Sequence, residues 1–182
     1  MRRNIQTVND DIVEMKRLIK QKLIADSDIL EALHNPDISI DSPDEFLDNN
    51  IYGFIRVPTT QDTVRNFICF TVDDIEENRF NEVMKRQYIQ FNAICHLDDM
   101  KTEFGIDRHD LIAYLIRDIF NWTNDFGLQF KLIYNKECPM DSDYYCRTLK
   151  FEAVKPNSLN KARMDSPYDK HRRWWATIVF WW

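Results

Sequence analysis

Apolar residues at helical spacing predict two helices near the amino terminus. The first carries an apolar residue at every third or fourth position, in the order Val8, Ile12, Met15, Ile19 and Leu23. Residues 28–34 predict a second, shorter helix with three apolar residues on one face. It ends before Pro36, because proline disfavours helical geometry in the residue that precedes it. The polar residues from there to Asn50 predict a long connection.

Strand patterns dominate the next part of the chain. Residues 51–57 and 65–72 are rich in β-branched and aromatic side chains, which predicts two short strands. Residues 85–97 alternate between two faces, one with Ile89, Phe91, Ala93, Cys95 and Leu97. The other face carries Tyr88, Gln90, Asn92 and His96. This alternation is typical of a strand in an antiparallel sheet, with one buried face and one solvated face.

A third helix is predicted after Asp107. Apolar residues at helical spacing give it a broad apolar face and a length of about 14 to 18 residues. Asp107 is in position to cap this helix, Asp110 lies in its first turn, and Gly127 is a natural terminator. The helix is expected to lie across the sheet.

The carboxyl-terminal part of the pattern predicts a hairpin and fixes the fold class. A strand over 128–134, turn residues over 138–143 and a strand over 146–153 follow one another. We therefore predict an α+β fold, with a mainly antiparallel sheet of about four to five strands packed against two or three helices. An extended arm follows the sheet.

The composition changes after residue 155. We expect a domain over 1–155 and a linker with an aromatic arm over 156–182. The arm ends in large apolar side chains that are too hydrophobic to remain in water: Trp174, Trp175, Ile178, Val179, Phe180, Trp181 and Trp182. Three destinations are open, namely the protein's own core, a neighbouring subunit, which we favour, and a membrane surface reached through the basic residues before the tryptophans.

Composition and charge exclude several classes of protein. The chain has 182 residues, 24 basic and 30 acidic side chains and a net charge of −6, which argues against a non-specific nucleic-acid binder. The aromatic content of 13% excludes a disordered chain. No apolar run is long enough for a membrane-spanning helix, and the amino terminus has no apolar run typical of a signal peptide.

Catalytic, cofactor and metal motifs are not found in the sequence. Its 3 glycines are isolated, so there is no phosphate-binding loop. The four cysteines form no CxxC pair, which favours buried free thiols. Cys95 and His96 are adjacent in a predicted strand, so their side chains point to opposite faces and do not suit one metal ion. We expect neither an enzyme, nor a cofactor, nor a metal site.

Acidic pairs occur at 73–74, 76–77 and 98–99, and the simplest interpretation is that they are solvated. The predicted loop over 73–82 concentrates five acids against one base. These acids are Asp73, Asp74, Glu76, Glu77 and Glu82. The alternative to a solvated tip is a surface that repels DNA passing close by.

Several segments together resemble the tail-completion or tail-terminator family of tailed bacteriophages. The resemblance covers about residues 5–155 and rests on the order of elements and on local sequence in the segments 23–33, 52–58, 65–74, 89–96, 110–116 and 148–154. The aromatic arm is not part of the family's pattern.

The resemblance implies a structural subunit of the virion neck, made in the host bacterial cytoplasm. Such subunits form a closed ring, commonly a hexamer, that terminates the tail tube and joins it to the head connector. Viral DNA passes through the ring without specific binding, and the five acids of 73–82 would then face the channel. The alternatives are a head-closure or other neck ring protein and, more remotely, a membrane-surface module or a cytoplasmic enzyme.

Overall fold

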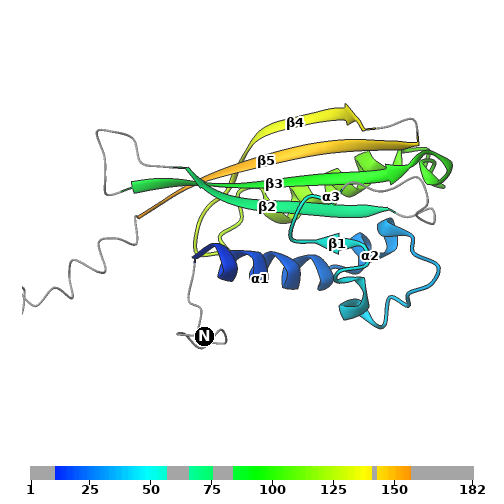
Figure 1. Ribbon diagram of the computed structural model, residues 1–182, viewed down its shortest axis with the longest axis horizontal. Coiled ribbons are helices and arrows are strands. Elements are labelled where there is room, and N and C mark those ends of the chain that lie inside the picture. The colour runs from blue at the N-terminus through cyan, green and yellow to red at the C-terminus, as the bar shows by residue number, and fades with distance from the viewer. Residues whose placement is uncertain (1–10, 57–65, 76–83, 141–142, 157–182) are drawn as a thin grey trace, which may run out of the picture.

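The computed structural model describes residues 11–56, 66–75, 84–140 and 143–156. The described elements, including two short 3-10 helices, follow in the order α1 (Asp11–Ile24), α2 (Ser27–Leu33), η2 (Pro43–Phe46), β1 (Ile51–Tyr52), β2 (Phe67–Ile75), β3 (Met84–His96), η3 (Leu97–Asp99), α3 (Arg108–Phe120), β4 (Lys131–Pro139) and β5 (Tyr144–Pro156). Figure 1 shows the strands side by side, with α1 and α2 below the sheet.

The strands form one five-stranded sheet in the order β1-β2-β3-β5-β4. The pair β1–β2 is parallel, and the other three neighbouring pairs are antiparallel. The predicted α+β class and the mainly antiparallel sheet are therefore confirmed.

The three helices contribute to one core on a single face of the sheet. Phe91, at the centre of this core, is fully buried and lies against the rings of Phe70, Phe120 and Phe151, with ring centroids 4.7 to 5.9 Å from its own. The α1 stripe supplies Met15, Ile19 and Leu23 to the same core. Val8, the first residue of the predicted stripe, lies outside the described residues.

Helix α2 is closed at both ends by local backbone and side-chain chemistry. The carboxylate of Asp26 accepts hydrogen bonds from the amides of Asp28 and Ile29 at 3.0 and 3.1 Å, which satisfies two otherwise free donors. His34 takes a left-handed conformation (φ 47°) at the carboxyl end. The predicted helix over 28–34 is confirmed to within one residue at each end.

The two strands predicted over 51–57 and 65–72 have different lengths in the structure. β1 contains only Ile51 and Tyr52, whereas β2 continues to Ile75. The prediction that Asp73 and Asp74 lie in a loop is wrong, because β3 is long enough to pair with them. Asp73 is opposite Tyr88, and Asp74 is opposite Gln87.

The predicted solvated face of β3 is only partly solvated. Tyr88 and Gln90 are half-buried, but Asn92 and Ile94 are buried. Ile94 belongs to a second, smaller apolar cluster on this face, together with Tyr52, Phe67, Cys69, Tyr144 and Cys146. Leu97, which was assigned to the buried face, lies in η3 and is 51% exposed because the strand ends at His96.

Two predictions about the ends of α3 are wrong. Asp107 stands at the first position before the helix, but its carboxylate is 2.5 Å from the ammonium of Lys101 and makes no capping hydrogen bond. The helix then ends at Phe120, before the predicted terminator Gly127. Gly127 instead takes a positive φ of 67° in a turn of the connection to β4.

The predicted carboxyl-terminal hairpin is confirmed, but its strands are displaced or extended. β4 begins at Lys131 and not at Leu128, and its register shifts between Leu132 and Tyr134. This irregularity breaks the predicted alternation, and both Ile133 (45%) and Tyr134 (46%) are exposed.

Candidate functional site

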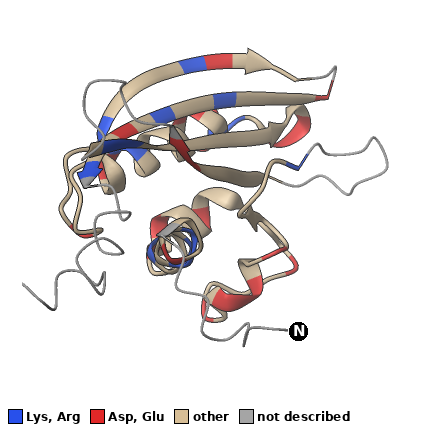
Figure 2. Cartoon of the chain, turned by 60° about the vertical axis from the view of Figure 1, so that its left-hand side comes forward, with Lys and Arg blue, Asp and Glu red and all other residues tan. Residues whose placement is uncertain are grey.

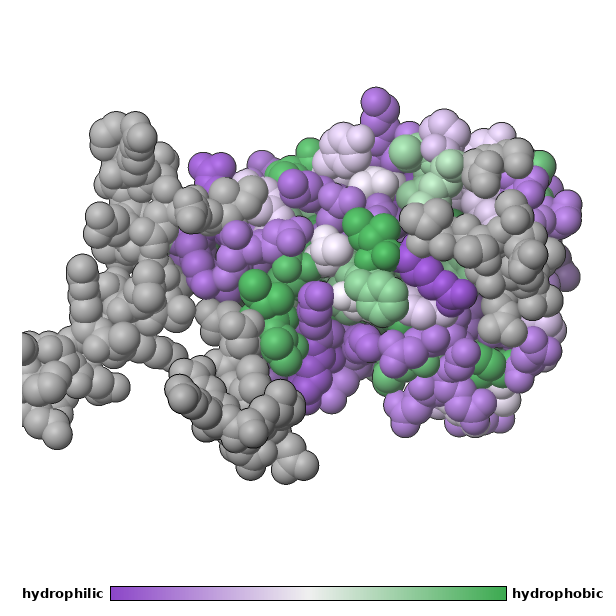
Figure 3. All heavy atoms as spheres, in the orientation of Figure 1, coloured by the Kyte–Doolittle hydropathy of each residue, from purple (hydrophilic) through white to green (hydrophobic). Residues whose placement is uncertain are grey.

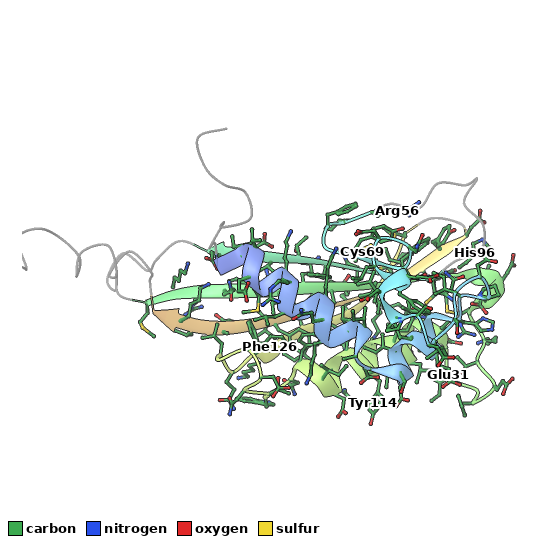
Figure 4. All side chains as sticks on the ribbon, turned by 90° about the horizontal axis from the view of Figure 1, so that it is seen from below. Glu31, Arg56, Cys69, His96, Tyr114 and Phe126 are labelled. Atoms are coloured by element: carbon green, nitrogen blue, oxygen red, sulfur yellow. The ribbon has the colours of Figure 1, made fainter. Side chains whose placement is uncertain are left out.

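A pocket of about 560 Å³ lies at one end of the sheet. It lies between α2, the segment 99–104 and the first two turns of α3. Figure 4 places Glu31, on the pocket wall, at the same end of the sheet as His96. The volume is within the range of pockets that hold a small ligand or large side chains.

An ion pair between Arg108 and Asp99 forms one wall of this pocket. Nη2 of Arg108 lies 3.1 Å from Oδ1 of Asp99, and Nε donates to the Asp99 backbone carbonyl at 2.7 Å. The remaining nitrogen, Nη1, donates to the carbonyl of Ala32 at 3.0 Å. The guanidinium therefore fastens the start of α3 to η3 and to the end of α2.

Two further side chains bind the same carboxylate. Nδ1 of His34 lies 3.0 Å from Oδ1 and 3.1 Å from Oδ2 of Asp99. Nδ2 of Asn66 donates to Oδ2 at 2.6 Å and to the carbonyl of Leu33 at 3.0 Å. Because both oxygens of Asp99 have partners from separate segments, this residue holds the wall together.

The mouth of the pocket combines apolar surface with free acids. Phe104 is 78% exposed, and Leu111 and Leu115 on α3 are half-buried. Asp28, Glu31 and Glu103 also line the pocket and are exposed, and within the described chain their carboxylates form no ion pair. These features suit a ligand that is apolar and positively charged.

The opposite side of the sheet ends in a free edge at β4. Figure 1 shows β4 at the upper border of the molecule, and no described strand pairs with its outer side. Every residue of β4 except Leu132 is exposed. Figure 2 shows basic and acidic positions next to each other on this strand, whose charged residues are Lys131, Lys136 and Glu137.

β2 has a free edge of its own beyond β1. β1 pairs only with Ile68 and Cys69, so within the described residues the segment 70–75 has no strand on that side. Asp73, which is exposed, lies on this part of β2. The sheet thus presents two different unpaired edges.

Asp74 does not have the character of a free acid. Its carboxylate is 20% exposed and lies 2.6 Å from Nζ of Lys85 and 3.4 Å from Nζ of Lys155, and Gln87 donates to it at 2.9 Å. Burial by itself raises the pKa of Asp74, but the hydrogen bonds and charges of these partners bring it below its usual value. Among the predicted channel acids, Asp74 is thus already paired within the subunit.

The other predicted site residues are placed as follows. Glu76, Glu77 and Glu82 lie outside the described residues, as does the whole aromatic arm from Trp174 to Trp182. Asp98 and Asp99 separate in role, because Asp98 is 78% exposed at its side chain whereas Asp99 is at the centre of the pocket wall.

The prediction of buried free thiols holds for Cys69, Cys95 and Cys146 but not for Cys138, which is exposed. Cys95 is fully buried in the main core, where burial raises the pKa of its thiol far above the usual value. His96 belongs to the opposite face, with its ring 4.9 Å from that of Tyr144. Burial also raises the pKa of Cys146 to about 11. No group of metal-ligating side chains is present in the described parts of the chain.

Sequence reasoning did not find the pocket or its central residues. Asn66, His34 and Arg108 carried no motif, because they lie 33, 65 and 9 residues from Asp99 in the chain and meet it only in the fold. The free apolar residue Phe104 was the one available signal, since it stands in an otherwise polar segment.

On the side shown in Figure 3, hydrophilic residues cover most of the surface and hydrophobic residues appear in separate patches. Among the described residues, no helix is long and apolar enough to cross a membrane.

Comparison with known proteins identifies a family for most of the chain. The family model described as YomW matches residues 19–153, from α1 to the last part of β5. No curated protein matches the chain.

Proposed function

Because the chain belongs to the YomW family, which is phage-derived, we propose that it is a structural protein of the bacteriophage virion that forms a ring in the neck. In this role the ring terminates the tail tube, joins it to the head connector and leaves a channel for DNA. The phage origin of the family supports the first part of this proposal, and the two free sheet edges support the second.

The edge of β4 carries the argument for a ring. An exposed strand edge offers a row of unpaired backbone donors and acceptors that can pair with another chain. β4 runs antiparallel to β5, β5 to β3, and β3 to β2, so β4 and β2 run in opposite directions. Copies placed side by side with their strands in one direction then bring β4 of one against β2 of the next in an antiparallel arrangement. Such a head-to-tail contact closes into a ring when its rotation closes.

The side chains on the two edges complement each other. β4 presents two lysines, Lys131 and Lys136, with Glu137, whereas the free part of β2 presents Asp73. Ile133 and Tyr134 supply apolar area on β4. Opposite charges on facing strands stabilise a pair, and like charges destabilise it.

Fewer of the five acids are free for the channel role than the sequence suggests. Asp74 is held by Lys85 and Lys155, so its charge is neutralised within the subunit. Asp73 is exposed in the subunit, but in the proposed ring it lies at the contact with β4 of the neighbour. The remaining channel acids proposed from the sequence, Glu76, Glu77 and Glu82, lie in the segment that directly follows β2.

A charge placed on β4 tests the proposal. Ile133→Glu, in the full chain, should weaken self-association by about tenfold or more, which corresponds to ~1.4 kcal/mol, because a carboxylate would then face the acidic edge of β2. Sedimentation and native mass spectrometry would measure the assembly, alone and with purified tails. Ile40→Glu is the matched control, since Ile40 has almost the same exposure (46%) and lies in a turn away from both edges.

A monomer at all concentrations that also fails to join purified tails would overturn the ring. A ring in which Ile133→Glu and Ile40→Glu behave alike would instead overturn the β4 contact. Attachment of the ring to heads instead of tails would favour the head-closure alternative.

A further inference from the structure

The pocket beside α3 has the chemistry of a docking site with apolar walls and an acidic mouth. Phe104, with 78% of its surface exposed, and the half-buried Leu111 and Leu115 give the pocket apolar area that would remain in contact with water in a lone subunit. The basic residues of the lining are already engaged, since Arg108 binds Asp99 and Lys101 binds Asp107. The uncompensated charge at the mouth is therefore negative.

The carboxyl-terminal arm has the complementary composition. Lys170, Arg172 and Arg173 come directly before Trp174 and Trp175, and further large apolar residues complete the chain. Three cations followed by tryptophans match three free carboxylates around apolar walls. Aromatic anchors in a pocket, with charges at its border, are the usual arrangement of a protein contact.

The geometry of the sheet separates this pocket from the place where the arm begins. Pro156 pairs with Met84 at one end of β3, and the pocket follows His96 at the other end. The two ends of β3 are ~40 Å apart. Residues 157–174 span at most ~60 Å when fully extended. The arm is therefore long enough to span the length of the sheet and reach the end at which the pockets lie.

We propose that the pocket formed by α2, the segment 99–104 and α3 binds the aromatic arm of a neighbouring copy. The inference rests on the proposed ring, in which each subunit has a neighbour on either side.

A photo-cross-linking experiment tests the contact directly in the full chain. A photoreactive amino acid in place of Trp175 would be activated in an assembled mixture of ¹⁴N- and ¹⁵N-labelled protein. The expected result is a cross-link to Phe104 or to the first turns of α3, found in mixed-isotope pairs. Cross-links to the pocket only within one chain would overturn the exchange between copies, and cross-links elsewhere would overturn the site.

Charge reversal at the mouth gives an independent measurement. In a Trp122→Phe background all remaining tryptophans lie in the arm, so tryptophan emission reports the arm alone. Adding Glu31→Lys and Glu103→Lys should expose the arm, with a red-shifted emission and at least about a twofold rise in the acrylamide quenching constant, because the lysines repel the basic residues before Trp174. Asp118→Lys is the control, since Asp118 is exposed on α3 outside the pocket.

Restoring the charge pairing with a second reversal distinguishes docking of the arm from misfolding. Measuring assembly as well distinguishes failure of this inference from failure of the proposed ring. Arg172→Glu with Arg173→Glu should expose the arm in the same way, and combining both reversals should restore protection. Exposure without rescue, or arm emission unchanged by any reversal, would overturn the docking site while leaving a ring seen by sedimentation in place. Binding of the arm to anionic vesicles in place of the pocket would also overturn it. Absence of a ring in the unsubstituted chain would instead count against the proposed function.

Discussion

The substitution Asp99→Asn separates the role of Asp99 from that of its neighbour Asp98. It preserves the shape of the side chain but replaces one carboxylate oxygen with an amide that donates hydrogen bonds. Both oxygens of Asp99 accept hydrogen bonds, from His34, Asn66 and Arg108. The NH₂ group introduced by asparagine would therefore face other hydrogen-bond donors.

The expected cost follows from the number of bonds affected. A hydrogen bond to a charged group contributes about 1.5–3 kcal/mol, and a buried donor without a partner costs a further amount of similar size. The Asp99 side chain is 19% exposed and that of Arg108 is 9% exposed, so solvent replaces these bonds only in part. With one to two bonds lost, the free energy of unfolding should fall by about 2–4 kcal/mol.

Urea unfolding of the full chain, followed by far-ultraviolet circular dichroism, would measure this difference, with an unchanged slope indicating an unchanged surface exposed on unfolding. Asp98→Asn is the matched control, because it makes the same chemical change one residue away at a side chain that is 78% exposed. It should change stability by less than about 0.5 kcal/mol. If both variants lose less than about 1 kcal/mol, the pocket wall does not depend on Asp99 and the assignment is incorrect.

Two further predictions concern the sheet. Because its partners lower the pKa of Asp74 below 3.8, the chain should lose stability as the pH falls through that lowered value. Asp74→Asn should reduce the free energy of unfolding at pH 7 but weaken this dependence on acid. Unfolding measured at pH 7 and at pH 3 would test both expectations. Phe91→Ala should lower the free energy of unfolding by about 3–5 kcal/mol, because a fully buried ring at the centre of the core is lost; calorimetry would measure it, and a loss below about 1 kcal/mol would contradict the central position of that ring.

Local patterns predicted the elements whose boundaries depend on local chemistry. The α1 stripe and the carboxyl end of α2 are set by apolar spacing and by Pro36, and both were predicted correctly. The end of β2 was not predicted, because Asp73 and Asp74 are poor strand residues that are held in the ladder by β3. Asp107 was assigned a capping role from its position before α3. Its ion pair with Lys101 was not predicted, because it depends on the path of the loop between the two residues.

The pocket was beyond sequence reasoning because its residues meet only through the fold. The sequence does not distinguish Asp98 from Asp99, yet Asp98 is solvated whereas Asp99 binds three side chains. Asn66 reaches that carboxylate from the position directly before β2, and Arg108 from the start of α3. No spacing rule connects these positions, because they lie at the borders of different elements and only the fold brings them together.

The charges on β4 also bear on which edge it pairs with. Two copies that met β4 to β4 in an antiparallel arrangement would bring two strands of net positive charge together, because each carries Lys131 and Lys136 against one acid, Glu137. Like charges on facing strands destabilise such a pair, and lysines on an edge are a common protection against it. The same lysines favour the free part of β2, where Asp73 is exposed. A symmetric dimer through β4 should therefore be disfavoured relative to the head-to-tail contact.

Raising the salt concentration should weaken the head-to-tail contact, because screening reduces the attraction between exposed charges. Sedimentation at low and at high salt would measure this, and assemblies that strengthen with salt would contradict the β4–β2 pairing.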